Sequence, residues 1–336
     1  MGERVQGVRG ERGKGVRGRP LGEVHPLTPS DRSLLTETSH ESLLASHSVG
    51  EALRAARAIL ERAGVPDAHR EADELYAALV GRASSAAWLE RSEPAPASLR
   101  SRLDEAARRR AAGWPQAYAT GRANFRGHWL AVDARVLIPR PETEGLVELA
   151  LAWMRDACSQ GAGCVVADVG TGSGAIAVAL ALESPAARIL ATDRSGGALE
   201  VARANVAAHG VAARVELLRG HLLAPLGAGR CDLVVSNPPY VATGDWERLE
   251  PVVREHEPRE ALDGGRDGLA VIGELVGAAS RALRPGGLLL LEVDAPRAAR
   301  VAELAAAAGF ASPDVLMDIF GRPRYVRAGR RADGRD

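Results

Sequence analysis

The sequence has almost no lysine, few aromatic residues and no net charge. Lys14 is the only lysine among the 43 basic residues, and 43 acidic residues balance them. Because a polyanionic partner is attracted by excess positive charge, we expect no stable binding of nucleic acid. No run approaches the roughly 18 consecutive apolar residues of a membrane span, and the N-terminus lacks the apolar core of a signal peptide. We therefore expect a cytoplasmic protein with no membrane partner.

The cysteines are also few, which excludes a disulfide framework. Cys158, Cys164 and Cys231 show no CxxC spacing, and an odd number of thiols cannot all pair. Such usage is typical of a reducing compartment rather than of a secreted fold. We interpret all three as buried thiols, and the sequence predicts no metal site.

The first 47 residues are rich in Gly, Arg and Ser and show no sustained apolar periodicity, as in GVRGERGKGVRGRP. Such a segment cannot bury enough apolar surface to offset the entropy of ordering. We therefore expect 1–47 to be a disordered extension and 331–336 to be a disordered tail. A weak RNA-contacting arm is the functional alternative for the N-terminal segment, because Arg-Gly tracts can contact RNA.

From Ser48 the pattern becomes that of amphipathic helices. In SVGEALRAARAILERAG, apolar residues recur at helical spacing and Gly64 marks the end. The stretches PDAHREADELYAALVG and APASLRSRLDEAARRRAAG repeat this design, so 48–113 is predicted to be a small helical bundle. The next segment, 114–141, is predicted to be a β-hairpin linker. It gathers four of the twelve aromatic residues, namely Trp114, Tyr118, Phe125 and Trp129.

Between 142 and 330, short apolar runs alternate with helical stretches, which is typical of βαβ units on a largely parallel sheet. Strands are predicted near 164–169, 188–193, 214–219, 232–236, 287–293, 314–319 and 324–328. Helices are predicted over about 142–157, 174–183, 196–208, 267–283 and 296–308. The predicted fold class is α/β, a Rossmann-like doubly wound domain with a mostly parallel seven-stranded sheet. Such sheets bind ligands beyond the carboxyl ends of their strands, so we expect the site where Gly170, Asp193 and Asn237 lie.

A glycine-rich turn follows the first predicted strand of this domain, in ADVGTGSGAIAVAL. Glycines let the backbone turn sharply and approach a ligand where a Cβ would collide, so the turn predicts a nucleotide-type cofactor. Taken alone, it also fits the dinucleotide-binding pattern or a tight turn without a ligand. The cofactor-binding residues predicted here are Asp168, Gly170, Thr171, Gly172, Ser173 and Gly174.

Asp193 ends the second predicted strand of this domain, about twenty residues further on. A carboxylate at this place can accept hydrogen bonds from both ribose hydroxyls of a nicotinamide or an adenosyl cofactor. The structural alternative is that Asp193 is the N-cap of the next helix.

The fourth predicted strand ends in Asn237-Pro238-Pro239-Tyr240. Pro238 biases Asn237 to an extended backbone, and neither proline has an N–H to donate. The Asn237 side-chain oxygen and a backbone carbonyl can therefore converge on an NH₂ group. We predict that Asn237, Pro238 and Tyr240 are catalytic, that all four residues bind the substrate, and that Asn237 also contacts the cofactor. Tyr240 would close the pocket or pack on a planar group.

The glycine turn and the Asn-Pro-Pro-Tyr sequence together resemble S-adenosylmethionine-dependent methyltransferases that act on planar amino or amide nitrogens. Further strings make the chain similar, over about 48–330, to the family of release factor glutamine methyltransferases. These strings are GWPQAYATGRANFRG, VLIPRPETEGLVE, HEPREALDGGRDGLAVI, LRPGGLLLLEV and DIFGRPRYVRA. The Pro-Arg-Pro-Glu-Thr-Glu sequence is the most specific of them, because the sister enzymes acting on a ribosomal protein usually diverge there.

The resemblance implies transfer of a methyl group from S-adenosylmethionine to the side-chain amide nitrogen, N5, of a glutamine. That glutamine belongs to the Gly-Gly-Gln motif of class 1 peptide-chain release factors, which act in translation termination. The glycine turn would hold the cofactor's methionine part, Asp193 its ribose, and Asn237 with Pro238 the target amide. The helical bundle 48–113 would dock the protein substrate.

One departure from the family pattern concerns the adenine. His221 and Leu222 stand where relatives commonly carry an acidic residue and often an aromatic one. Leu222 can still offer an apolar face to the adenine, whereas His221 cannot replace a carboxylate that accepts from its amino group.

Other functions stay open on sequence alone. The same chemistry would serve a glutamine of a ribosomal protein or the N6 of adenine in nucleic acid, although neutral charge argues against the latter. A nicotinamide-dependent dehydrogenase is a further alternative, but it needs a proton donor such as His at the end of the fourth strand. The last alternative function is that of a non-catalytic nucleotide-binding module.

Overall fold

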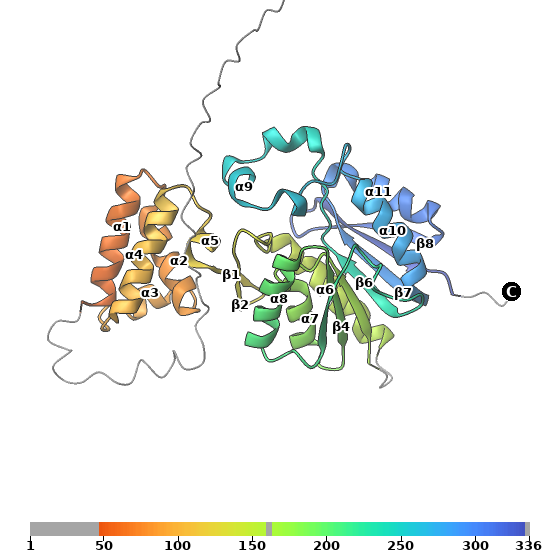
Figure 1. Ribbon diagram of the computed structural model, residues 1–336, viewed down its shortest axis with the longest axis horizontal. Helices are drawn as coiled ribbons and strands as arrows, with labels where there is room; N and C mark the ends of the chain where they lie inside the picture. The colour runs from red at the N-terminus through yellow and green to blue at the C-terminus, as the bar shows by residue number, and fades with distance from the viewer. Residues whose placement is uncertain (1–46, 159–162, 333–336) are drawn as a thin grey trace, which may run out of the picture.

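The computed structural model describes residues 47–158 and 163–332. The predicted disordered segments, 1–47 and 331–336, lie almost wholly outside these ranges. A helical region is followed by a short β-hairpin and then by a large α/β region (Figure 1). No helix within the two described ranges is long and apolar enough to cross a membrane.

The helical region consists of α1 (Val49–Arg62), α2 (Ala68–Val80), α3 (Ala86–Leu89) and α4 (Ala97–Ala111). Helix α1 begins at a capping box, in which Ser48 and Glu51 each accept a hydrogen bond from the backbone N–H of the other. Buried side chains from α1, α2 and α4, such as Leu60, Leu75 and Leu103, form the core of this region together with many alanines. Helix α3 was not predicted, because four residues are too few to show a helical period.

The hairpin lies between the two larger regions. After the short helix α5 (Gln116–Thr120), strands β1 (Arg122–Phe125) and β2 (His128–Ala131) pair antiparallel. Arg126 and Gly127 both have positive φ, as the tight two-residue turn between the strands requires. The Asn205 amide of the α/β region holds β2, since it accepts from the Ala131 N–H at 2.7 Å and donates to the Ala131 carbonyl at 2.9 Å.

The α/β region contains one seven-stranded sheet in the order β5-β4-β3-β6-β7-β9-β8. The five strands from β5 to β7 are parallel, and β9 runs antiparallel to both of its neighbours. This confirms the predicted fold class. The strands are β3 (Val165–Val169), β4 (Arg188–Asp193), β5 (Val215–Arg219), β6 (Cys231–Ser236), β7 (Leu283–Glu292), β8 (Phe310–Met317) and β9 (Pro323–Arg330). The main helices are α6 (Pro141–Ala157), α7 (Ala175–Glu183), α8 (Gly196–Ala208), α10 (Ala270–Ala282) and α11 (Ala295–Ala307).

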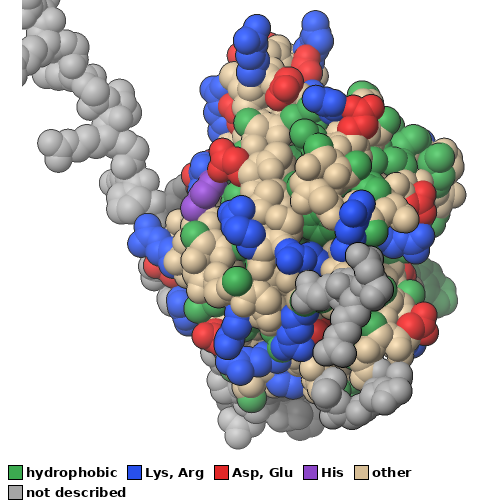
Figure 2. Space-filling model, turned by 90° about the vertical axis from the view of Figure 1, so that its right-hand side faces the viewer, with side chains coloured by type: hydrophobic (Ala, Val, Ile, Leu, Met, Phe, Trp, Pro, Cys, Tyr) green, Lys and Arg blue, Asp and Glu red, His purple; other side chains and the backbone are tan. Residues whose placement is uncertain are grey.

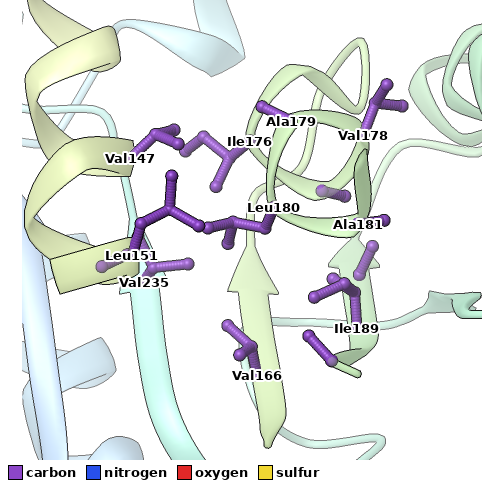
Figure 3. Packing of buried hydrophobic residues seen from close by; sticks show 14 of the residues in the cluster. Val147, Leu151, Val166, Ile176, Val178, Ala179, Leu180, Ala181, Ile189 and Val235 are labelled. Atoms are coloured by element: carbon purple, nitrogen blue, oxygen red, sulfur yellow. The ribbon is translucent and has the colours of Figure 1, made fainter. Parts of the chain in front are cut away.

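The sheet is covered on both faces, so its central strands alternate between two cores. Leu233 and Val235 of β6 pack with α6 and α7, whereas Val234 between them packs with α10 and α11. Figure 3 shows Val147 and Leu151 of α6 pointing toward helix α7 beside the strands. Burial on both faces explains why these strands are continuous apolar runs in the sequence.

Two details differ from the sequence predictions. Between β6 and α10 the chain forms η3 (Thr243–Arg248), α9 (Pro251–His256) and η4 (Arg259–Ala261), none of which was predicted. Strand β8 begins four residues earlier than expected. A register shift between Ala311 and Asp314, where Ser312 has a positive φ, interrupts its alternation there.

The interpretation of the cysteines as three thiols was wrong for two of them. Cys158, just after α6, and Cys164, just before β3, form a disulfide with their Cα atoms 5.7 Å apart. Cys231 is free and buried, as predicted. The spacing of six residues gave no pairing signal, because the approach of these ends depends on how α6 packs on the sheet.

Figure 2 shows the face that carries the C-terminal part of the chain. On its described part, basic and acidic side chains are interspersed, and apolar side chains gather in the upper half. This mixture agrees with the balanced composition.

Candidate active site

The carboxyl ends of three adjacent parallel strands bring the main predicted residues together. Val169 of β3 lies opposite both Thr192 of β4 and Ser236 of β6. The residues that follow them therefore meet at one edge, as the sequence predicts. They line a cavity of about 130 Å³ whose walls include Gly170, Gly172, Asp193, Leu222, Asn237 and Pro239.

The glycine turn is shaped to leave room for a ligand. Gly170, Gly172 and Gly174 all have positive φ, at 71°, 54° and 81°. A Cβ at Gly172 would have only the Gly170 carbonyl oxygen within 4 Å, at 3.9 Å, so it would occupy open space beside the cavity. At Gly174 a Cβ would lie 3.3 Å from that of Ala202, so this glycine allows α7 and α8 to pack closely.

Asp168 supports the turn from below and does not line the cavity. Its Oδ2 accepts hydrogen bonds from the Thr171 hydroxyl at 2.6 Å and from the Ala177 N–H at 3.1 Å. Thr171 and Ser173, which belong to the turn, are likewise buried. Complete burial raises the Asp168 pKa from 3.8 to about 7, against the effect of these two hydrogen bonds, and the nearby Asp193 adds to the rise.

Asp168 should therefore make stability depend on pH. Between about pH 4 and 7 the folded carboxyl keeps a proton that the unfolded one has lost, so the free energy of unfolding falls as pH rises through this window. Asp168→Asn does not titrate at this position. We therefore expect the free energy of unfolding of the variant to rise relative to that of wild type as the pH increases from about 4 to 7, and the difference to stay constant above pH 7. Urea unfolding of both proteins from pH 4 to 8 measures this, and a constant difference between them would contradict the shift.

Asp193 joins the glycine turn to the next helix. Its Oδ2 accepts from the Gly172 N–H and its Oδ1 from the Ser195 N–H, both at 2.9 Å. The N-cap of α8 is Ser195, whose hydroxyl accepts from the Ala198 N–H at 3.2 Å. The alternative interpretation, in which Asp193 is the N-cap of α8, is therefore wrong. Each carboxylate oxygen has a second lone pair for a ligand hydroxyl at the cavity.

The Asn237 amide has a defined orientation. Its Nδ2 donates a hydrogen bond to the Thr143 hydroxyl oxygen at 3.1 Å, and Thr143 is buried in the first turn of α6. The side-chain oxygen is therefore the end left for a ligand in the cavity that Asn237 lines. The Ser236 hydroxyl fixes the strand end by donating to the Val169 carbonyl at 2.7 Å.

Like Asp168, Thr171, Ser173 and Gly174, two residues of the Asn-Pro-Pro-Tyr sequence lie outside the cavity lining. Pro238 is buried, and Tyr240 packs against the core beneath α10 and α11. Burial, with the charge of Glu292 as the next cause, raises the Tyr240 pKa to about 12. Its phenol therefore stays protonated at neutral pH.

His221 and Leu222 also line the cavity, as the sequence predicts. Leu222 has a φ of 49°, and His221 Nε2 lies 2.8 Å from Glu274 Oε2 on α10. The Glu274 carboxylate thus contacts His221, the residue that stands where relatives commonly carry an acidic side chain.

The sequence reasoning missed a wall of the cavity formed by 135–137 and by 258–263. Buried Glu257 joins these two segments, since it accepts from the Ile138 N–H at 3.2 Å and from the Arg140 guanidinium at 2.6 Å. The Tyr118 hydroxyl donates to the Val136 carbonyl at 2.5 Å. Arg140 lies in the Pro-Arg-Pro-Glu-Thr-Glu string and Glu257 in the His-Glu-Pro-Arg-Glu string. These strings were noted only because they resemble those of a known family, and nothing in them indicated a cavity wall.

The fold and the site define an S-adenosylmethionine-dependent methyltransferase. Residues 151–252 match the family model of the methyltransferase small domain, and residues 51–121 match that of the PrmC N-terminal domain. The turn has room for this cofactor, because glycines keep Cβ atoms out of the cavity, and the Asp193 carboxylate in the same lining has acceptor capacity to spare.

Curated relatives narrow the class to one family. The chain is 42% identical over 278 residues to a release factor glutamine methyltransferase of Cereibacter sphaeroides, with 83% of this chain and 97% of the relative covered. It is 44% identical over 288 residues to one of Moorella thermoacetica, with 85% and 98% covered. A relative of the same name from Deinococcus radiodurans is 43% identical over 282 residues, with 84% and 98% covered. The chain belongs to the release factor glutamine methyltransferase family.

Proposed function

We propose that this enzyme methylates the side-chain amide nitrogen, N5, of the glutamine in the Gly-Gly-Gln motif of class 1 release factors. The observation that carries the proposal is the fixed amide of Asn237, whose oxygen is left at the cavity because its nitrogen bonds Thr143. An acceptor there suits an NH₂ group, and the names of the relatives specify a glutamine in a release factor. The enzyme would act in the cytoplasm, where translation terminates.

The residues that would hold the cofactor lie along the cavity. Gly170 and Gly172 leave space for its methionine part, Asp193 would accept from its ribose, and Leu222 would cover its adenine. Asp168, Thr171, Ser173 and Gly174 would contribute by shaping the turn. When bound, S-adenosylmethionine supplies the electrophilic methyl group.

The chain's own residues would activate the target nitrogen by orienting it. A carboxamide nitrogen is a weak nucleophile, because its lone pair is delocalised into the carbonyl group. The Asn237 side-chain oxygen and the Pro238 carbonyl would each accept one of its hydrogens, which turns the lone pair toward the methyl group. The same acceptors stabilise the positive charge that develops on nitrogen. Pro239 would line the pocket, and Tyr240 would support the loop from the core side.

Thr143 should act on catalysis through Asn237. Thr143→Val removes the acceptor that orients the amide, so we expect kcat to fall about 5- to 10-fold, as for the loss of one hydrogen bond. Thr143→Ser keeps the hydroxyl and should restore most of the rate. Steady-state kinetics with a release factor measures both variants, and equal rates for Val and Ser would contradict the orienting role.

Docking of the protein substrate needs surface beyond the cavity, because a loop glutamine must protrude to enter it. The helical region, 48–113, and the hairpin that follows it would provide part of this surface. The hairpin adjoins the site through α8, whose Asn205 holds β2 and whose Ala198 lines the cavity.

The function is tested by transfer of labelled methyl groups to four substrates in parallel. These are a purified class 1 release factor, its variant with Gln→Ala in the Gly-Gly-Gln motif, ribosomal protein and DNA. We expect label on the unaltered release factor alone. Label only on ribosomal protein, or only on DNA, would overturn the proposal.

A further inference from the structure

The turn between β8 and β9 exposes a cluster of large apolar side chains. Among the described residues, five such side chains are strongly exposed, and three of these are Met317, Ile319 and Phe320. Ile319 is 93% exposed and Phe320 is 72% exposed. Single exposed apolar residues are common on protein surfaces, but contiguous ones at one place mark interaction sites.

This turn is held in a fixed shape. The buried Asp318 carboxylate accepts from the backbone N–H groups of Phe320 and Arg322, both at 2.9 Å, and from the Arg322 guanidinium at 2.9 Å. Gly321 has a φ of 75°, which completes the turn. Ile319 and Phe320 are therefore presented outward by an ordered loop, so little conformational entropy is lost when a partner covers them.

The turn also lies at the edge of the sheet that carries the active site. Since β9 is antiparallel to both β7 and β8, strand β8 runs parallel to β7 and ends at the same edge as β6. A chain of contacts links the turn to the site. Arg322 lies 3.6 Å from the Glu142 carboxylate, and the Tyr325 hydroxyl donates to the Glu142 carbonyl at 2.6 Å. The next residue, Thr143, holds Asn237.

The local charges favour a polypeptide partner over a polyanion. Arg322 is paired with Asp318 and stacks its guanidinium over the Phe320 ring, 5.1 Å from its centre. Arg324 lies 3.9 Å from the Asp318 carboxylate. The basic groups here are thus matched by acidic ones, and the exposed surface is apolar.

We propose that Ile319 and Phe320 are a docking contact for the protein substrate, and that they bind apolar side chains close to the target glutamine. This rests on the proposed function and adds the contact that places the substrate loop over Asn237. Apolar contacts made equally in the bound and transition states lower KM without changing kcat.

The test is a variant carrying Ile319→Ser and Phe320→Ser, with release factor as the varied substrate. We expect KM for the release factor to rise roughly 10- to 100-fold, as for loss of a small apolar hot spot. The kcat, the affinity for S-adenosylmethionine and the melting temperature should stay at wild-type values. Phe320→Trp keeps the apolar area and should keep the wild-type KM.

The matched control is Arg327→Ser, which alters a half-exposed side chain of the same hairpin away from the turn. An unchanged KM in the double variant, or an equal rise in the control, would overturn the docking role while wild type still methylates the release factor. Wild type that fails to methylate the release factor would instead overturn the proposed function, and the docking role with it.

Discussion

Asn237→Ala is expected to lower the rate of methyl transfer by about 10²- to 10³-fold, the range for removing one preorganised hydrogen-bonding group from a polar transition state. The variant loses the fixed acceptor that turns the target nitrogen toward the methyl group. Because the glycine turn and Asp193 are untouched, affinity for S-adenosylmethionine should change far less than the rate, although Asn237 is also predicted to contact the cofactor. Single-turnover rates with release factor, together with calorimetric cofactor titration, separate the two effects.

Asn237→Asp is the informative companion to this variant. Its carboxylate has no N–H for the Thr143 hydroxyl, and its charge attracts a sulfonium without reproducing the orientation of the amide. We expect it to be nearly as slow as the alanine variant. Turnover close to wild type in Asn237→Ala would refute the role of the amide acceptor.

Gly172→Ala is expected to weaken S-adenosylmethionine binding by roughly 10- to 100-fold, because its Cβ would crowd the cofactor at the turn and overpacking of a close contact costs about 1–3 kcal/mol. The position is otherwise uncrowded, with a single atom at 3.9 Å, so the protein itself has room for the methyl group. The substitution should therefore reduce cofactor affinity and not the packing of the protein. Isothermal titration with S-adenosylmethionine and with S-adenosylhomocysteine measures it.

Gly210→Ala is the matched control for this variant. Gly210 has a φ of 69°, and a methyl group there would have no atom within 4 Å, but the residue lies after α8 and away from the cavity. Both substitutions carry a left-handed backbone penalty of about 1–2 kcal/mol. Only Gly172→Ala should affect cofactor affinity, and an equal loss in both variants would assign the effect to backbone strain.

The fold class could be predicted because the central strands are buried on two faces. Within the predicted strands 232–236 and 287–293, the runs 233–235 and 288–291 are wholly apolar, and turn signals follow close by. The meeting of Gly170, Asp193 and Asn237 followed from strand order alone, since parallel strands end at one edge. The family and its cofactor were also predicted correctly.

Other features depend on tertiary contacts that leave no local pattern. The cavity wall formed by 258–263 is irregular backbone, held by Glu257 through contacts with Ile138 and Arg140, more than a hundred residues earlier in the chain. The orientation of the Asn237 amide depends on Thr143, another distant residue. The roles of the predicted site residues stay predictions until the variants are measured.

The carboxylate of Asp193 bridges the backbone of the glycine turn at Gly172 and the start of α8 at Ser195. Two segments that would otherwise move independently are thereby fixed as one unit when the chain folds. The proposed ribose acceptor thus has its final position before any ligand arrives, and binding need not order it. Cofactor affinity should therefore depend on the two hydrogen bonds from Gly172 and Ser195 to Asp193 as much as on direct contact with the ribose.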